Sequence, residues 1–141
     1  MKNPLRSTAT IIATMVAATI LMSPPAGAHD VQEETVTPVQ RKSLPDVPGK
    51  QLILAVVAYE PGQASAAHFH PGSVFAYVLE GEIASQLEGE PERVYKAGES
   101  WYEPPRKPHL VSRNTSSTKP AKLLAVLLGD EGGPVKLPLE K

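Results

Sequence analysis

The chain has 141 residues, enough for a single domain, and its formal net charge of −1 gives no electrostatic reason to expect a nucleic acid partner. It contains no cysteine, which excludes disulfide bonds and thiolate metal ligands. The 15 prolines and 10 glycines predict many short elements joined by turns.

The first 28 residues have the features of a secretory signal peptide. Lys2 and Arg6 make a basic start, residues 7–22 are uncharged and mostly apolar, and residues 26–28 (Ala-Gly-Ala) form a small-residue cleavage site. A retained membrane anchor is the alternative, but the apolar run is shorter than the span of about 20 residues that a bilayer requires. We therefore predict cleavage after residue 28, export to a bacterial periplasm or the medium, and no membrane association afterwards.

Residues 29–50 are predicted to form a polar, proline-spaced arm outside the folded domain. Pro38, Pro45 and Pro48 interrupt any helix and favour extended chain. The arm also carries several apolar side chains, which a free tail would not need. We expect it to cover an exposed strand edge of a second copy, giving a homodimer.

The remaining residues, 51–141, alternate between short apolar runs and turn signals. No stretch has the periodicity of an amphipathic helix, so the pattern predicts an all-β sandwich or barrel. About eight strands are expected by these signals, at residues 52–59, 64–70, 74–79, 83–87, 93–95, 100–103, 109–113 and 122–128.

Three of the four histidines stand in two places. His68 and His70 are two residues apart in a predicted strand, where side chains at i and i+2 share a face. His109 follows a proline-rich turn later in the chain. Three imidazoles that converge on one point would form a metal site, and no other part of the sequence suggests comparable chemistry.

These residues resemble the two motifs of the cupin superfamily. Residues 62–81 are similar to the first motif, which is a glycine, five residues, His-x-His, three or four residues, a glutamate, six residues and a glycine; His68 and His70 fall in register. Residues 98–114 look like the second motif, with His109 as its histidine. The resemblance implies a single-domain double-stranded β-helix (jelly-roll) barrel with any small ligand bound inside it.

One position departs from the cupin pattern. The glutamate of the first motif is the fourth metal ligand, and its slot here holds Val74, or Phe75 with the longer gap. The resemblance therefore implies three protein ligands, His68, His70 and His109. Three neutral imidazoles leave a divalent ion with its full charge, which favours an anionic substrate or a bound hydroxide. Such ligands suit a transition metal (Fe, Zn, Cu, Ni or Mn) and suit Mg or Ca poorly.

The sequence leaves several functions open. One is a metal-dependent enzyme acting on a small anionic or oxygen-rich molecule, with a non-haem-iron dioxygenase, as in three-histidine cupins, the most definite version. Zinc would instead suit hydrolysis or hydration. Another is an exported protein that binds a metal or small ligand without chemistry. The histidines are also compatible with an ancestral site that holds no metal.

Three further side chains near the predicted site are candidates for catalysis. Glu103 would serve as a stand-in carboxylate or a general base, or else is a surface charge. Tyr102 would donate a hydrogen bond to bound oxygen, or else packs on its strand. Arg113, which strict alternation places on the face of His109, would clamp a substrate carboxylate, or else is an exposed arginine at a strand end.

Overall fold

The computed structural model describes residues 33–139, so the predicted signal peptide lies outside the described residues. Within that range the chain forms strands and no helix, and hence no helix able to cross a membrane. The all-β prediction is confirmed. The strands are β1 (Thr35–Ser43), β2 (Lys50–Tyr59), β3 (His68–Phe69), β4 (Ser73–Glu80), β5 (Glu82–Leu87), β6 (Arg93–Lys96), β7 (Ser100–Glu103), β8 (His109–Asn114), β9 (Ala121–Asp130) and β10 (Leu137–Pro138).

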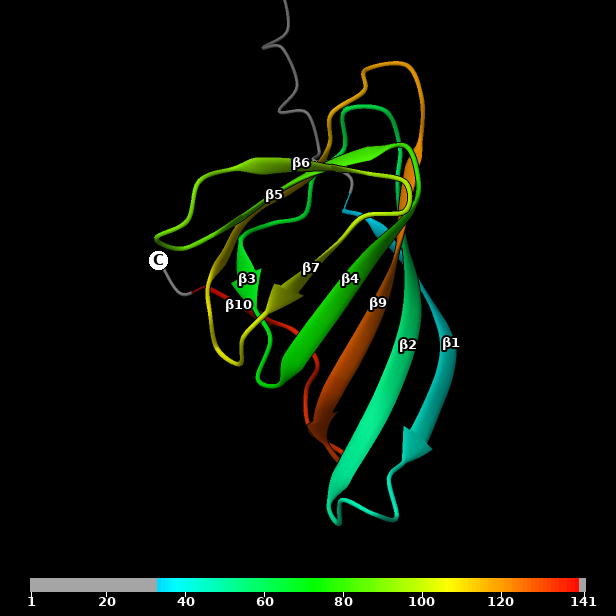
Figure 1. Cartoon of the computed structure of the whole chain (residues 1–141), viewed down its shortest axis with the longest axis vertical. Coiled ribbons are helices and arrows are strands. Elements are labelled where there is room, and N and C mark those ends of the chain that lie inside the picture. Colours follow the sequence, from blue (N-terminus) through cyan, green and yellow to red (C-terminus); the bar gives the residue numbers. More distant parts are fainter. Residues whose placement is uncertain (1–32, 140–141) are drawn as a thin grey trace, which may run out of the picture.

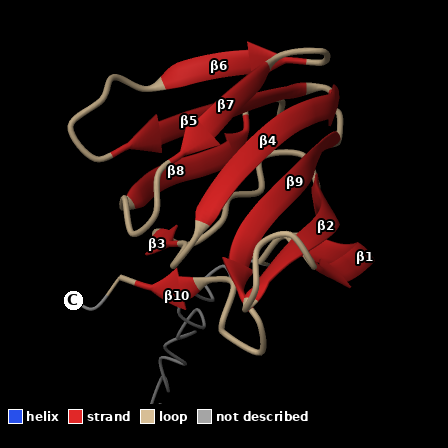
Figure 2. Ribbon diagram, turned by 60° about the horizontal axis from the view of Figure 1, so that its bottom comes forward, coloured by secondary structure: helices blue, strands red, loops and turns tan. Residues whose placement is uncertain are grey.

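Two antiparallel sheets face each other across the interior (Figures 1 and 2). The first has the order β1-β2-β9-β4-β7 and the second the order β10-β3-β8-β5-β6. Strands that follow each other in the chain often belong to different sheets, so the chain crosses between layers as in a double-stranded β-helix. Inward-facing side chains of both sheets therefore meet in one interior space.

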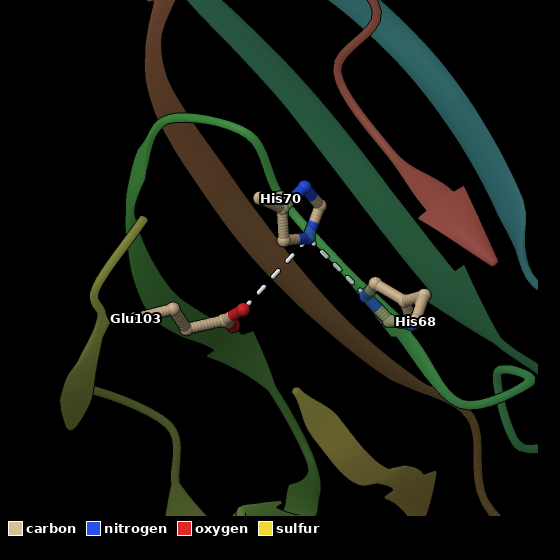
Figure 3. Close-up of side chains that lie close together, drawn as sticks. All are labelled: His68, His70 and Glu103. Carbon is tan, nitrogen blue, oxygen red and sulfur yellow. Dashed lines mark hydrogen bonds and ion pairs between the residues drawn. The ribbon is translucent and has the colours of Figure 1, made fainter. Parts of the chain in front are cut away.

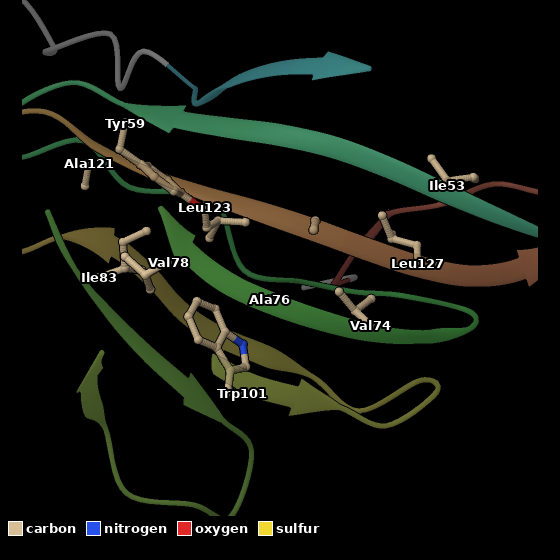
Figure 4. Close-up of a cluster of buried hydrophobic side chains, with 11 residues drawn as sticks. Ile53, Tyr59, Val74, Ala76, Val78, Ile83, Trp101, Ala121, Leu123 and Leu127 are labelled. Atoms are coloured by element: carbon tan, nitrogen blue, oxygen red, sulfur yellow. The ribbon is translucent and has the colours of Figure 1, made fainter. Parts of the chain in front are cut away.

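The hydrophobic core fills part of that space (Figure 4). Val78 and Ile83 are completely buried where β4 and β5 come together across the interior. Trp101 of β7 stacks on Tyr95 of β6, with ring centroids 4.8 Å apart. Small inward side chains on the first sheet, such as Ala76, leave room beside this core, and the functional cavity lies there.

Residues 35–43 of the predicted arm form strand β1 of the barrel. Instead of crossing to a neighbour, β1 pairs antiparallel with β2 of its own chain along nearly its whole length. Pro38 is tolerated because β1 is an edge strand, where a missing N–H removes no essential ladder bond. The register shifts by one residue between Pro38 and Gln40, a β-bulge that re-aims the side chains beyond it.

A tight approach of two backbones fixes the turn that follows His70. A Cβ atom on Gly72 would lie 1.9 Å from the carbonyl oxygen of Leu128, so only glycine allows β9 to pass this close. The contact anchors the end of the His-x-His segment against the first sheet. The imidazole of His70 is thereby directed into the interior, at the open end of the core.

Candidate metal centre

His68 and His70 reach the interior from β3 and the turn after it. Their Nε2 atoms lie 3.2 Å apart, so the two rings point at each other (Figure 3). His68 stands opposite His109 in the β3–β8 pairing, which brings the second motif beside the first. The period of two that was noted in the sequence thus produces a converging pair of imidazoles.

Backbone carbonyls set the tautomers of both rings. His68 Nδ1 lies 2.7 Å from the Ala66 oxygen, and His70 Nδ1 makes a short contact with the Val135 oxygen. A carbonyl only accepts, so each Nδ1 carries the proton and each Nε2 of the neutral ring presents a lone pair. Two lone pairs at this distance repel unless a cation lies near both.

Glu103 completes the group from β7. Its Oε1 accepts a hydrogen bond of 2.9 Å from the indole N–H of Trp101, which orients the carboxylate. Its Oε2 lies 3.8 Å from His70 Nε2 and 3.3 Å from His109 Nδ1, yet is buried without an aligned hydrogen-bond partner. An orphaned carboxylate oxygen beside two imidazole lone pairs is costly to bury and marks a place for a positive ion.

The donor set fits a transition-metal ion. One ligand atom each from His68, His70 and Glu103 lies within 4.8 Å of the other two. Metal–nitrogen and metal–oxygen bonds of about 2.1 Å place two ligands of one ion at most about 4.2 Å apart. The 3.2 Å separation of His68 from His70 and the 3.8 Å separation of His70 from Glu103 meet that condition, and the third pair, His68 and Glu103, lies within 4.8 Å. Two imidazoles and one carboxylate, with further positions open, suit iron or zinc.

The carboxylate that the cupin pattern expects on β4 is present on the neighbouring strand. Val74, which fills the motif slot, faces inward with only 2% of its surface exposed and pairs directly with Glu103 in the β4–β7 ladder. Phe75, the slot for the longer gap, points outward and is 58% exposed. The group of possible ligands in the structure therefore includes a carboxylate, which the expected set of three histidines did not. With Glu103 included, a divalent ion would keep a net charge of +1 in place of +2.

His109 lies beside Glu103, but its Nε2 atom points away from the possible metal ligands and toward β5. That atom lies 2.8 Å from Ser85 Oγ on β5, and the Nδ1 atom faces Glu103 Oε2. Like Glu103 Oε2, the buried Nδ1 has no aligned hydrogen-bond partner. His109 is thus placed to hold Glu103, and its predicted role as a third metal-ligating histidine stays a prediction.

The pKa values of the three central groups favour metal binding at neutral pH. Burial lowers the pKa of His68 to about 4, helped by the charge of His70 and opposed by the Ala66 carbonyl. Burial also lowers the pKa of His70, although Glu103 acts against the change. For Glu103, burial raises the pKa, but His109 and His70 outweigh it and the net shift is downward. Both imidazoles are therefore neutral and the carboxylate is ionised, which are the forms that ligate.

Two other predicted site residues lie away from the group. Tyr102 points outward from β7, is 44% exposed, and packs on Phe75, because strand alternation places it opposite to Glu103. Arg113 pairs with Glu92 at 2.6 Å on the surface. The face argument for Arg113 fails because Leu110 is an extra residue in β8: Gln86 pairs with Val111 and Leu87 with His109.

An interior cavity of about 400 Å³ opens beside these residues. Most of its wall is apolar and is supplied by inward side chains of the first sheet. Its polar groups are the histidines, Glu103, a few hydroxyls and, from β1 and the chain termini of the described range, Glu34, Gln40, Arg41 and Lys136. The side chains of Ile53, Ala55, Val57, Tyr59, Ser65, His68, His70, Val74, Ala76, Trp101, Glu103, His109, Ser112, Leu123, Ala125, Leu127 and Val135 line it, together with residues 34, 36, 38–41 and 136.

Several polar residues of this cavity were missed in the sequence. Tyr59 OH lies 2.7 Å from Ser65 Oγ and 2.8 Å from Ser112 Oγ, and burial raises the pKa of Tyr59 to about 12, so the phenol stays protonated. A signal did exist for Ser85, the hydrogen-bond partner of His109, which shares the inward face of β5 with the apolar residues Ile83 and Leu87. For Ser112 the same alternation misleads, because the extra residue Leu110 reverses the faces of β8.

Comparison with known proteins identifies the family of this fold. A family profile described as "Cupin domain" matches residues 55–127, which is more than half of the chain. The chain belongs to the cupin domain family. Among the curated proteins no sequence matches it.

Solved structures share the fold of this cupin. The protein TT1209 from Thermus thermophilus is 30% identical, with 72% of this chain and 88% of that chain covered and a TM-score of 0.55. A Klebsiella pneumoniae protein with a double-stranded β-helix domain is 22% identical (78% and 87% covered, TM-score 0.62). The DMSP lyase DddQ from Ruegeria pomeroyi is 23% identical (81% and 55% covered, TM-score 0.63), so the present chain spans just over half of that lyase.

The lowered pKa of His68 predicts a loss of stability in acid. The folded-state pKa of about 4 lies below the ordinary 6.5, so between these values the unfolded chain binds a proton that the folded chain does not. The stabilisation is complete above pH 6.5 and is lost as the pH falls toward 4; Glu103 acts in the same direction below its ordinary 4.5. We expect the free energy of unfolding of the chelator-treated protein to fall by about 3 kcal/mol between pH 7 and 4.

Urea denaturation at pH 7, 5.5 and 4 measures this dependence. The matched control is His68→Gln, which should show a clearly shallower decline because its side chain does not titrate. Equal slopes for the two proteins would show that His68 is not held neutral by the fold.

Proposed function

We propose that this cupin is a metal-dependent enzyme that acts on a small molecule in the cavity between its two sheets. A single observation carries the proposal: two imidazole lone pairs and an orphaned carboxylate oxygen converge at the wall of a cavity large enough for a substrate. A non-haem-iron dioxygenase is the most specific version, because two histidines and one carboxylate with open positions are the usual iron set of oxygenases.

The residues of the chain have separate tasks in this proposal. His68, His70 and Glu103 would hold the ion, which would supply Lewis-acid or redox chemistry when bound. The carbonyls of Ala66 and Val135 keep both rings in the ligating tautomer. His109 links Ser85 to Glu103 and is the group best placed to hold or move a proton beside the cavity.

An exported binding protein without chemistry is the alternative. A site closed by apolar walls would favour it, but here the ligand group borders an open cavity and has His109 beside it. The two functions differ in whether the ion keeps free positions. Loading the protein with Fe(II) and adding nitric oxide tests this without knowledge of the substrate, since only an ion with a free position gives the spin-3/2 EPR signal.

Exchange of Val74 and Glu103 tests which strand supplies the carboxylate. Glu103→Val should lower the affinity for Fe(II) or Zn(II) at least about a hundredfold, because it removes the only charged ligand. The double variant Val74→Glu/Glu103→Val returns the carboxylate to the motif slot, directly opposite its present position, and should recover most of the loss. Calorimetric titration of the metal measures both.

The control for this exchange is Phe75→Glu/Glu103→Val. It adds the same charge one residue along β4, but on the outward face, and should recover nothing. Equal affinities for the two double variants would place the metal elsewhere. Val74→Glu alone should lower the melting temperature, since it buries two carboxylates side by side.

We propose that the protein is exported, on the strength of its basic start, its uncharged segment and the small residues before position 29. The mature chain should then begin at His29. Mass spectrometry of the protein recovered from the periplasm of the native host measures this start. A mass that includes residues 1–28 would contradict cleavage, and recovery in the cytoplasm alone would contradict export.

We propose a homodimer that forms through the outer face of the first sheet. A row of apolar side chains crosses four of its strands there, with Leu54, Val126, Phe75 and Tyr102 paired in sequence across the ladder. Phe75 and Tyr102 are 58% and 44% exposed. A patch of this kind on a folded protein favours association.

A second copy of the chain fits this outer face. The ion pair Lys122–Glu80 (2.9 Å) lies on one side of the apolar row, toward one end of the strands, and Lys50–Asp130 (2.6 Å) lies on the other side, toward their opposite end. Each end therefore offers one cation and one anion. A copy related by a two-fold axis would meet complementary charges at both ends, while the apolar centre packs on itself.

Phe75→Lys should convert this dimer to a monomer, because it places a charge at the centre of the apolar row. Leu110→Lys is the matched control. It makes the same apolar-to-charged change at an exposed residue of the second sheet and should leave the dimer intact. Light scattering at high protein concentration gives the mass. A monomeric wild type, or a dimer that survives Phe75→Lys, would contradict this interface.

A further inference from the structure

The cavity has one cationic side chain that no carboxylate neutralises. Arg41 of β1 and Lys136 before β10 both line it. Lys136 pairs with Glu34, whereas Arg41 forms no ion pair with any residue of the described range 33–139. A lone guanidinium at the wall of a mostly apolar cavity is suited to a ligand that brings its own negative charge.

A β-bulge turns Arg41 toward the cavity. On β2 the inward residues include Ile53, Ala55 and Val57, and their partners on β1 are Arg41, Pro38 and Val36. Arg41 and Pro38 lie three positions apart, although their partners on β2 lie only two apart, because one residue is inserted after Pro38. Without that insertion Gln40 would stand opposite Ile53 and Arg41 would point the other way.

A buried amide then holds the guanidinium in place. Gln51 is only 4% exposed, and its Nε2 donates to the Asp130 carbonyl at 2.7 Å, which fixes the direction of its oxygen. That oxygen accepts from Arg41 Nη1 at 3.3 Å. Gln51 therefore positions Arg41, and most guanidinium donors stay available for a ligand.

Arg41 lies at the end of the cavity that also holds the metal-binding group. Gln51 and His70 line one small recess together with Val135, whose carbonyl accepts from His70. The opposite end of the cavity holds Tyr59 and its serine partners. Between these ends the wall is formed by aliphatic side chains.

We infer that the ligand of this cavity is a small monocarboxylate with an apolar body, whose carboxylate pairs with Arg41. The inference rests on the proposed function in taking the cavity as the substrate pocket, and it names the class of substrate. A polyhydroxylated acid would leave its hydroxyl groups without partners along the aliphatic wall, at a cost to affinity. An uncharged analogue would bind more weakly because it could not form an ion pair with the guanidinium of Arg41.

Hexanoate, hexanamide and gluconate are matched probes of these two features. Hexanamide lacks the charge of hexanoate, and gluconate keeps the charge and the six carbons but adds hydroxyl groups. Trp101, the only tryptophan of the chain, lines the cavity, so its fluorescence reports binding. Titrations of the chelator-treated protein should give hexanoate an affinity at least about tenfold above either analogue.

Arg41→Gln should weaken hexanoate binding about tenfold and leave hexanamide binding unchanged. Arg93→Gln is the matched control, since Arg93 is an exposed arginine of β6 that does not line the cavity. The inference is overturned if Arg41→Gln binds hexanoate like the wild type, or if hexanamide or gluconate binds as tightly as hexanoate.

The same titrations separate this inference from the proposed function. Because they use metal-free protein, carboxylate selectivity that depends on Arg41 stands even if calorimetry shows that no metal binds. Metal binding without that selectivity would instead leave the proposed function intact and reject the substrate class.

Discussion

The two Nε2 atoms of His68 and His70, 3.2 Å apart with their lone pairs facing, form the contact on which the functional end of the barrel depends. Each ring is denied the proton that would relieve the repulsion, because its Nδ1–H is committed to a backbone carbonyl. Burial opposes a second proton by lowering both pKa values. Glu103 supplies the negative charge; Trp101 holds one of its oxygens, and the other faces His70 and His109 without an aligned hydrogen bond. The proposal of a metal centre rests on this arrangement of two neutral imidazoles and one carboxylate.

Two β-bulges decide what surrounds that site. In β8 the extra residue Leu110 keeps His109 inward and brings Ser112 inward with it, while Arg113 is sent to the surface. In β1 the extra residue after Pro38 places the exposed side chain of Arg41 on the cavity side of the strand. Strict alternation would have given a different cavity in both places, with a different charge. Bulges of this kind commonly re-aim side chains beside functional sites.

The pairing of β4 with β7 places a carboxylate directly beside the motif slot that lacks one. Val74 and Glu103 are direct neighbours in the β4–β7 ladder, so their side chains project into the same region of the interior. The proposed metal site therefore does not require the carboxylate to stand at the motif slot itself. The aliphatic residue left at the motif slot extends the apolar wall of the cavity, which suits the substrate class inferred from Arg41.

The sequence by itself determined the all-β fold and the convergence of His68 and His70. Both follow from local periods: short apolar runs between turn residues, and a spacing of two within a strand. It also marked Glu103 as a substitute carboxylate but did not settle which face of β7 it occupies. Only the tertiary structure decided that Glu103 points inward, that Tyr102 and Arg113 do not, and that residues 35–43 join the barrel. These outcomes depend on strand register and on single inserted residues, which are set by pairing between distant segments and leave no periodic signal in the chain.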